Sequence, residues 1–346
     1  MDFDFSDDQQ QLRDAVRRWV DKAYTFEHRR AAVKAGGFSR DTWAELADLG
    51  LTALTVPEAH GGLGLGAVDA MVVMEELGRG MVLEPLAQAF ITGAVLGQFA
   101  PEAVQAQWLP RVAAGESIVV LAQQERRARY RLDRCEAQAT RNGAGYAVTA
   151  RKSIVPIGDK ADAFLVPALL DGQQALFLVE ASAEGVSTQG YGTQDGSRAA
   201  ELQCNGSPAT LVTTDGLSAL ELAVDVGSAS VCAEAVGVME QALLTTADYL
   251  NQRKQFGVAI ASFQALRHRV ADMKMQLELA RSMSYYASLK LGAPADERRR
   301  HLTRLYLRQA GEHLARLLAL DAALKISGSR SFSWFFATYN AGLLIT

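Results

Sequence analysis

Apolar residues recur at helical spacing through the first third of the chain. Between residues 6 and 115 they fall three or four positions apart, as at Leu12 and Val16, and this spacing places side chains on one face of a helix. Ser6, with Gln9 three residues later, is typical of a helix start, and Ser39 is a second plausible cap. The sequence therefore predicts a helical N-terminal part.

The pattern changes to short β-prone runs from about residue 117 to residue 214. Turn residues separate these runs at Asn142-Gly143 and at Asp171-Gly172. Such punctuation predicts an antiparallel sheet or barrel. The clearest runs are Ile118–Leu121, Tyr146–Thr149, Ala175–Val179 and Ala200–Cys204.

Helical spacing returns after residue 217, in segments expected at Leu217–Leu250, Phe263–Leu291 and Arg298–Ile326. We therefore predict an α+β multidomain fold: an all-α domain over residues 1–116, a β-domain over 117–214 and a helical bundle over 215–346. The glycine-rich run at 57–66 lies between helices, not in a βαβ unit, which favours an interhelical loop over a dinucleotide-binding turn.

Composition excludes several classes of function. The 346 residues are 49% hydrophobic and carry 35 basic against 39 acidic side chains, a net charge of −4, which gives no general attraction for nucleic acid or anionic membranes. Three separated cysteines and five scattered histidines predict no metal site. The start of the chain has no signal-peptide layout, and no uncharged apolar run reaches about 18 residues. We expect a cytoplasmic protein without a membrane span.

The segment Tyr249–Met273 is the most informative one in the sequence. A helix is expected to break at Gly257 and to resume before Ala271. In one interpretation this is a plain helical hairpin with its basic residues in solvent and its aromatic residues in the core. In the other, Arg253 binds a diphosphate while Phe256 and an amide side chain contact a flat ring system. The residues alone leave both open.

This segment resembles the signature of acyl-CoA dehydrogenases, with its tyrosine-leucine pair, Arg-x-x-Phe-Gly turn, Phe-Gln pair and Ala-Asp-Met in register. The resemblance implies FAD as cofactor and an acyl thioester, on CoA or a carrier protein, as substrate. It implies that Arg253 contacts the FAD pyrophosphate of a neighbouring subunit, with Phe256, Phe263 and Gln264 around the adenosine. A homo-oligomer or hetero-oligomer follows, because the cofactor then lies across a subunit boundary.

The β-domain departs from the family pattern where a flavin is usually held. By resemblance, the flavin contacts after the first two strands fall at Ala122 and at Pro156, in place of the usual threonines, and the usual tryptophan is replaced by Ile154. Basic residues replace the loop that normally follows. These substitutions resemble pimeloyl-CoA dehydrogenase small subunits, in which an acidic substrate end would meet Arg129 or a neighbouring arginine; a solvated basic loop is the alternative.

The end of the chain departs further. The family's adenine-binding glycine motif should fall near Lys325 and Gly328, of which only the glycine is retained. No Asp or Glu follows Asp321, so the usual catalytic glutamate is absent, and the alternative position of that base is occupied by Gly227. Asp225 is the nearest carboxylate, and by resemblance it lies at a substrate-binding position. The catalytic base is therefore not assigned.

Three functions stay open on these grounds. The first is α,β-dehydrogenation of an acyl thioester, with an electron-transfer flavoprotein as the family's usual acceptor. The second is a noncatalytic partner subunit of a heteromeric acyl-CoA dehydrogenase. The third is a flavin-dependent monooxygenase of the same fold.

Overall fold

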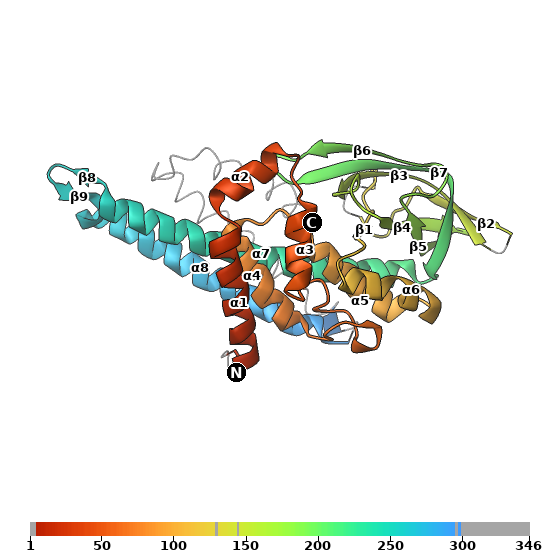
Figure 1. Cartoon of the computed structure of the whole chain (residues 1–346), viewed down its shortest axis with the longest axis horizontal. Coiled ribbons are helices and arrows are strands. Elements are labelled where there is room, and N and C mark those ends of the chain that lie inside the picture. Colours follow the sequence, from red (N-terminus) through yellow and green to blue (C-terminus); the bar gives the residue numbers. More distant parts are fainter. Residues whose placement is uncertain (1–4, 129–130, 144, 295–296, 299–346) are drawn as a thin grey trace. The chain divides into compact units, whose positions relative to one another are not determined.

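The computed structural model of the chain describes residues 5–128, 131–143, 145–294 and 297–298 (Figure 1). Its α-helices are α1 (Asp7–Ala23), α2 (Phe26–Lys34), α3 (Arg40–Asp48), α4 (Ala67–Gly80), α5 (Leu86–Phe99), α6 (Glu102–Ala113), α7 (Gly216–Gln252) and α8 (Gln264–Leu291). The strands are β1 (Val119–Leu121), β2 (Gln138–Asn142), β3 (Gly145–Pro156), β4 (Ala163–Leu170), β5 (Gln173–Glu180), β6 (Val186–Gly192), β7 (Arg198–Thr213), β8 (Lys254–Gln255) and β9 (Val258–Ala259). Short 3-10 turns lie at η1 (Glu58–His60) and η2 (Ile260–Ser262).

The order of helices, then strands, then helices confirms the predicted fold class. The first two helices expected after residue 217 correspond to α7 and α8, whereas the third, expected at 298–326, lies outside the described residues. The predicted caps are also confirmed. Ser6 and Gln9 form a reciprocal capping box at the start of α1, and the Ser39 hydroxyl accepts a hydrogen bond from the Thr42 N–H at 3.2 Å.

The chain forms two compact units, one from residues 1–29, 67–82 and 228–346, the other from 30–66 and 83–227. In the first unit α1 and α8 pack against α4. Helices α4 and α7 approach unusually closely, because glycine stands at both contact points. A Cβ at Gly237 would lie 1.8 Å from the Glu75 carbonyl oxygen, and one at Gly78 would lie 2.1 Å from that of Glu234. Only glycine permits this crossing.

Buried carboxylates tie the helices of the first unit together. The Glu76 side chain is fully buried and forms ion pairs with Arg17 at 2.7 Å and Arg13 at 3.2 Å. Its neighbour Glu75 pairs with Arg281 of α8 at 3.0 Å. Burial raises the pKa of Glu75, while Arg281 and Arg13 oppose that rise. The network therefore links α1, α4 and α8 by charge as well as by packing.

The second unit contains a β-barrel. Strands β2, β3, β7, β5 and β4 pair in a closed ring. Outside this ring of pairings, β1 pairs with the first residues of β4, and β6 pairs with β7. The prediction of a sheet or barrel is thus resolved as a barrel, although β4 pairs in parallel with β1 and β2. The predicted turn at Asp171-Gly172 joins β4 and β5, and both residues have positive φ, as a two-residue hairpin of the primed type requires.

The glycine-rich run at 57–66 is the predicted interhelical loop. It contains η1 and leads into α4. A Cβ at Gly62 would lie 1.9 Å from the Val56 carbonyl oxygen, so the glycine is needed for a close backbone approach. A structural reason therefore accounts for this glycine.

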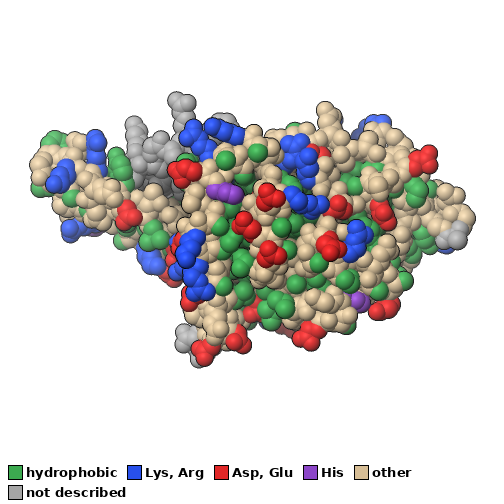
Figure 2. All heavy atoms as spheres, viewed as in Figure 1, with side chains coloured by type: hydrophobic (Ala, Val, Ile, Leu, Met, Phe, Trp, Pro, Cys, Tyr) green, Lys and Arg blue, Asp and Glu red, His purple; other side chains and the backbone are tan. Residues whose placement is uncertain are grey.

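Helix α7 is, among the described residues, long and apolar enough to cross a membrane by length and composition alone, but 61% of its most apolar window is buried within the protein. A buried core helix passes the same test. Figure 2 shows acidic and basic side chains interspersed over one face, in agreement with the small net charge.

Candidate functional site

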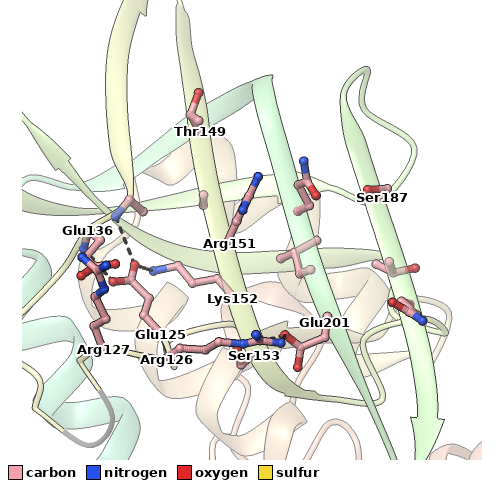
Figure 3. Close-up of a pocket in the computed structure, with 16 residues that line it drawn as sticks. Glu125, Arg126, Arg127, Glu136, Thr149, Arg151, Lys152, Ser153, Ser187 and Glu201 are labelled. Atoms are coloured by element: carbon pink, nitrogen blue, oxygen red, sulfur yellow. Dashed lines mark hydrogen bonds and ion pairs between the residues drawn. The ribbon is translucent and has the colours of Figure 1, made fainter.

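The loop that follows β1 is held by a buried carboxylate. Glu125 is 4% exposed and accepts hydrogen bonds from the Lys152 ammonium at 2.6 Å, the Glu136 N–H at 2.6 Å and the Ala137 N–H at 3.1 Å (Figure 3). Burial alone would raise its pKa, but Lys152 and the two backbone N–H groups outweigh burial, and the pKa of Glu125 is lowered. The carboxylate is therefore ionised and fixed.

Lys152 completes this anchor from β3. Its side chain is 1% exposed and also donates a hydrogen bond to the Pro167 carbonyl of β4 at 2.8 Å. Buried lysines are rare unless paired, because an isolated ammonium loses its hydration. The Lys152–Glu125 pair thus connects the loop after β1 to two strands of the barrel.

A second polar cluster surrounds Glu201 of β7. Its carboxylate accepts hydrogen bonds from the Ser153 hydroxyl at 3.0 Å and the Tyr191 hydroxyl at 3.3 Å, and forms an ion pair with Arg126 at 3.6 Å. Burial and the nearby Glu201 carboxylate raise the pKa of Tyr191. Arg126 is largely in solvent, which makes its pair the weakest contact of the cluster.

The backbone between Lys152 and Pro156 is irregular. The pairing of β3 with β7 shifts register between Lys152 and Val155, and Ile154 has φ of 53° with 54% of its surface exposed. A β-branched residue with positive φ is sterically disfavoured and costs on the order of 1–3 kcal/mol. The residue at the expected tryptophan position is therefore a strained, exposed isoleucine.

Ala122 and Pro156, the predicted flavin contacts of the β-domain, offer little to a flavin. Ala122 is fully buried and its N–H is already bonded to the Leu165 carbonyl at 2.9 Å. Pro156 has no N–H and no hydroxyl. Flavin rings are usually held through donors to their polar edge, so these two positions do not match the chemistry that the resemblance implied for them.

The Arg253 turn lies at the end of the α7–α8 pair (Figure 1). Helix α7 ends at Gln252, and β8 and β9 form a small hairpin through Phe256 and Gly257, which have φ of 55° and 78°. This confirms the predicted break at Gly257. The Phe256 side chain is 91% exposed and contacts the Phe263 ring edge-on at 6.3 Å between centroids. Core packing of Phe256, one of the two interpretations, is therefore wrong.

The remaining predicted residues of this turn are also accessible. Phe263 precedes α8 and is 36% exposed, and Gln264 is the exposed first residue of that helix. Among the described residues, no carboxylate forms an ion pair with Arg253. Within the described residues, the turn therefore exposes a guanidinium, an amide and two aromatic rings.

Other predicted positions are described in part. Asp225 lies half-buried on α7, two residues before Gly227. Arg129, Lys325 and Gly328 lie outside the described residues. Within the residues that the structure describes, no group of three or more His, Cys, Asp or Glu side chains could hold a metal ion. Burial raises the pKa of Cys204 to about 11 and of Cys232 to about 12, so both are protonated thiols.

Sequence reasoning missed the Glu125 anchor and the Glu201 cluster. The sequence does contain a signal, since Lys152 continues the alternating apolar positions Val148 and Ala150 of one strand face, where a lysine needs a partner. It gives no indication of which carboxylate supplies that partner.

Known proteins share both the sequence pattern and this architecture. The family model described as Acyl-CoA dehydrogenase, N-terminal domain, matches residues 6–116, and Acyl-CoA dehydrogenase, C-terminal domain, matches residues 214–336. Acyl-CoA dehydrogenase FadE27 of Mycobacterium tuberculosis is 32% identical over 277 residues, which span 79% of this chain and 72% of that protein.

Two solved structures are similar over nearly the whole chain. One is the Tcur3481-Tcur3483 steroid ACAD, with a TM-score of 0.85, 25% identity and coverage of 97% of this chain and 92% of that chain. The other is the ChsE4-ChsE5 complex from Mycobacterium tuberculosis, with a TM-score of 0.84, 26% identity and coverage of 99% and 93%. These findings confirm the family resemblance: the chain belongs to the acyl-CoA dehydrogenase family, whose members bind FAD, and is an oxidoreductase of the type that acts on the CH–CH bond of acyl-CoA thioesters.

Proposed function

We propose that this chain acts in a mixed oligomer with a second chain of the family, in which its Arg253 turn completes a flavin site held mainly by the partner. The observation that carries the proposal is the exposure of this turn, with Phe256 91% exposed. Apart from the edge-on contact of Phe256 with Phe263, these exposed side chains add little packing within the described chain. They match the pyrophosphate and ring faces of FAD.

The β-domain also supports the proposal that the partner chain holds most of the flavin. Ala122 and Pro156 lack donors for a flavin ring, and Gly227 stands where a catalytic carboxylate could otherwise lie. FAD, where bound, supplies hydride acceptance during α,β-dehydrogenation. For that reaction we assign to this chain the binding of the cofactor's diphosphate by Arg253, and ring contacts by Phe256, Phe263 and Gln264.

The similar solved structures favour a heteromer, since both are named as pairs of different chains. We also propose that the chain is related to pimeloyl-CoA dehydrogenase small subunits and that its substrate carries an acidic acyl chain. The proposed domain boundaries lie near residues 116 and 214. We propose that Asp225 lies beside the substrate and does not act as the catalytic base.

Coexpression with a neighbouring family chain tests the proposal. We expect a mixed oligomer that copurifies with FAD, whereas this chain alone binds little. In the mixed oligomer, Arg253→Ala should weaken FAD binding about tenfold or more, because a charge-assisted diphosphate contact is lost. Flavin absorbance after dialysis measures the retained cofactor.

Arg269→Ala is the matched control, since Arg269 is an exposed arginine of α8 beyond the turn. It should leave FAD binding unchanged. A chain that binds FAD and oxidises acyl-CoA by itself would exclude the partner role. Equal FAD retention in the Arg253→Ala and wild-type oligomers would exclude the role of the turn.

A further inference from the structure

A polar pocket lies on the outer part of the barrel sheet, apart from the Arg253 turn. It has a volume of about 720 Å³, within the range of about 300–1,000 Å³ common for small-molecule sites. Strands β3, β7 and β6 form its floor, and the loop that starts at Glu125 forms one wall (Figure 3). Because the Glu125–Lys152 pair fixes this loop, the wall is preorganised.

Three hydrogen-bond donors stand in one row across the floor. Arg151 of β3 is directly opposite Gln203 of β7, which is directly opposite Ser187 of β6. Residues opposite each other in paired strands project from the same face, with Cβ atoms about 4.5–5.5 Å apart. The Gln203 amide gives one hydrogen to Asn205 at 2.9 Å and retains a second. A guanidinium, an amide and a hydroxyl therefore line one face in a row about 10 Å long between the outer Cβ atoms.

Charges within the pocket are unevenly compensated. Lys152 is paired with Glu125, and Arg126 is paired with Glu201. Of the remaining charged side chains in the lining, Arg127 and Arg151 are positive and Glu136 is negative. No described carboxylate forms an ion pair with Arg151, so the end of the pocket at the donor row is electropositive.

We propose that this pocket binds a small molecule through an oxyanion, either phosphate or carboxylate, seated on the row of Arg151, Gln203 and Ser187. An arginine fork with two neutral donors is a common recognition set for such a group. The Glu201 end, where hydroxyl groups and a paired carboxylate line the pocket, would accept the neutral polar part of the ligand. The site is distinct from the flavin contacts and does not rest on the mixed-oligomer proposal.

Titration calorimetry of the purified full chain with pyrophosphate and, separately, with citrate tests the site. We expect saturable binding of at least one probe. Pyrophosphate binding without citrate binding would assign a phosphate ligand, and the reverse would assign a carboxylate ligand; both support the oxyanion site. Arg151→Gln should weaken binding about tenfold or more, and Ser187→Ala should weaken it about threefold.

Arg141→Gln is the matched control, because Arg141 is an exposed arginine of β2 that pairs with Asp171 outside the pocket. Both arginines are exposed, so the variants should keep the wild-type melting temperature. The proposal is overturned by a chain that binds neither probe, by binding that survives Arg151→Gln, or by an equal loss in Arg141→Gln, which would indicate general charge attraction.

Discussion

Replacing Lys152 by methionine should strongly destabilise the β-barrel. The wild-type ammonium is buried and donates to the Glu125 carboxylate at 2.6 Å and to the Pro167 carbonyl at 2.8 Å. Methionine has a similar length but no donor. Lys152→Met therefore leaves a buried carboxylate with its two backbone N–H donors and the weak Cys135 thiol donor, and leaves the Pro167 carbonyl without its ammonium partner.

The expected cost follows from these losses. Removing one member of a buried ion pair costs about 3–5 kcal/mol, because the remaining charge stays desolvated. The Pro167 carbonyl, if left unsatisfied, accounts for about 1–3 kcal/mol within that total. We therefore expect the free energy of unfolding to fall by about 3–5 kcal/mol at pH 7.

The pH dependence distinguishes a lost charge pair from lost packing. In the wild type the pKa of Glu125 is below its usual value of 4.5, so the stability from this group is present above pH 4.5 and is lost as the pH falls through the lowered pKa. Without Lys152, burial raises that pKa, so the variant loses stability as the pH rises above 4.5. The difference between wild type and variant should therefore grow from pH 4.5 to pH 7.

Urea unfolding, followed by a barrel-specific signal such as amide exchange of β3 and β4, measures the effect at both pH values. The double variant Lys152→Met with Glu125→Gln removes both charges and should recover about 2 kcal/mol of the loss. Arg141→Met, which breaks an exposed pair, should cost less than about 1 kcal/mol. A pH-independent loss, or a loss below about 1 kcal/mol for Lys152→Met, would refute the reasoning.

Three further changes test other parts of the chain. Gly237→Ala should destabilise the first unit by about 3 kcal/mol or more in chemical unfolding, since its Cβ would meet a backbone oxygen at 1.8 Å. The control Gly292→Ala, where the nearest atom to the added Cβ is 3.9 Å away, should be nearly neutral. Equal effects of the two substitutions would contradict the close crossing of α4 and α7. Ser39→Ala should cost about 1 kcal/mol through loss of the α3 cap, and Ser39→Asp should restore it. Phe256→Gly should stabilise the isolated chain by about 1 kcal/mol, because φ of 55° suits glycine. The same substitution should weaken FAD binding in the mixed oligomer. A lower free energy of unfolding for the variant would show that the ring packs within the chain.

Features governed by neighbouring residues could be predicted from the sequence. The Ser6 capping box, the Ser39 cap and the turn at Asp171-Gly172 each depend on three or four consecutive residues, and the structure has each where it was expected. The long helical segments followed from periodicity. Local chemistry decides such elements, so one sequence suffices.

Features that join distant segments could not be predicted in this way. Glu125 and Lys152 are 27 residues apart, and they meet because the fold brings the loop after β1 against β3. The crossing of α4 and α7 depends on Gly78 and Gly237, which look like ordinary helix glycines in the sequence. Pairing between strands and helices sets these contacts, and periodicity carries no information about partners.

The conformation of the Arg253 turn is not explained by the stability of this chain. Within this chain it is unfavourable, since Phe256 combines positive φ with 91% exposure of an aromatic side chain. Left-handed backbone costs a non-glycine residue roughly 1–2 kcal/mol, and the exposed ring recovers none of that cost by burial. The edge-on contact with Phe263 offsets only part of it, about 0.5–1.5 kcal/mol, so a further contact from outside the described residues would stabilise the turn. In the proposed mixed oligomer, a flavin bound across the subunit boundary would supply such a contact, with its pyrophosphate at Arg253 and its rings over Phe256.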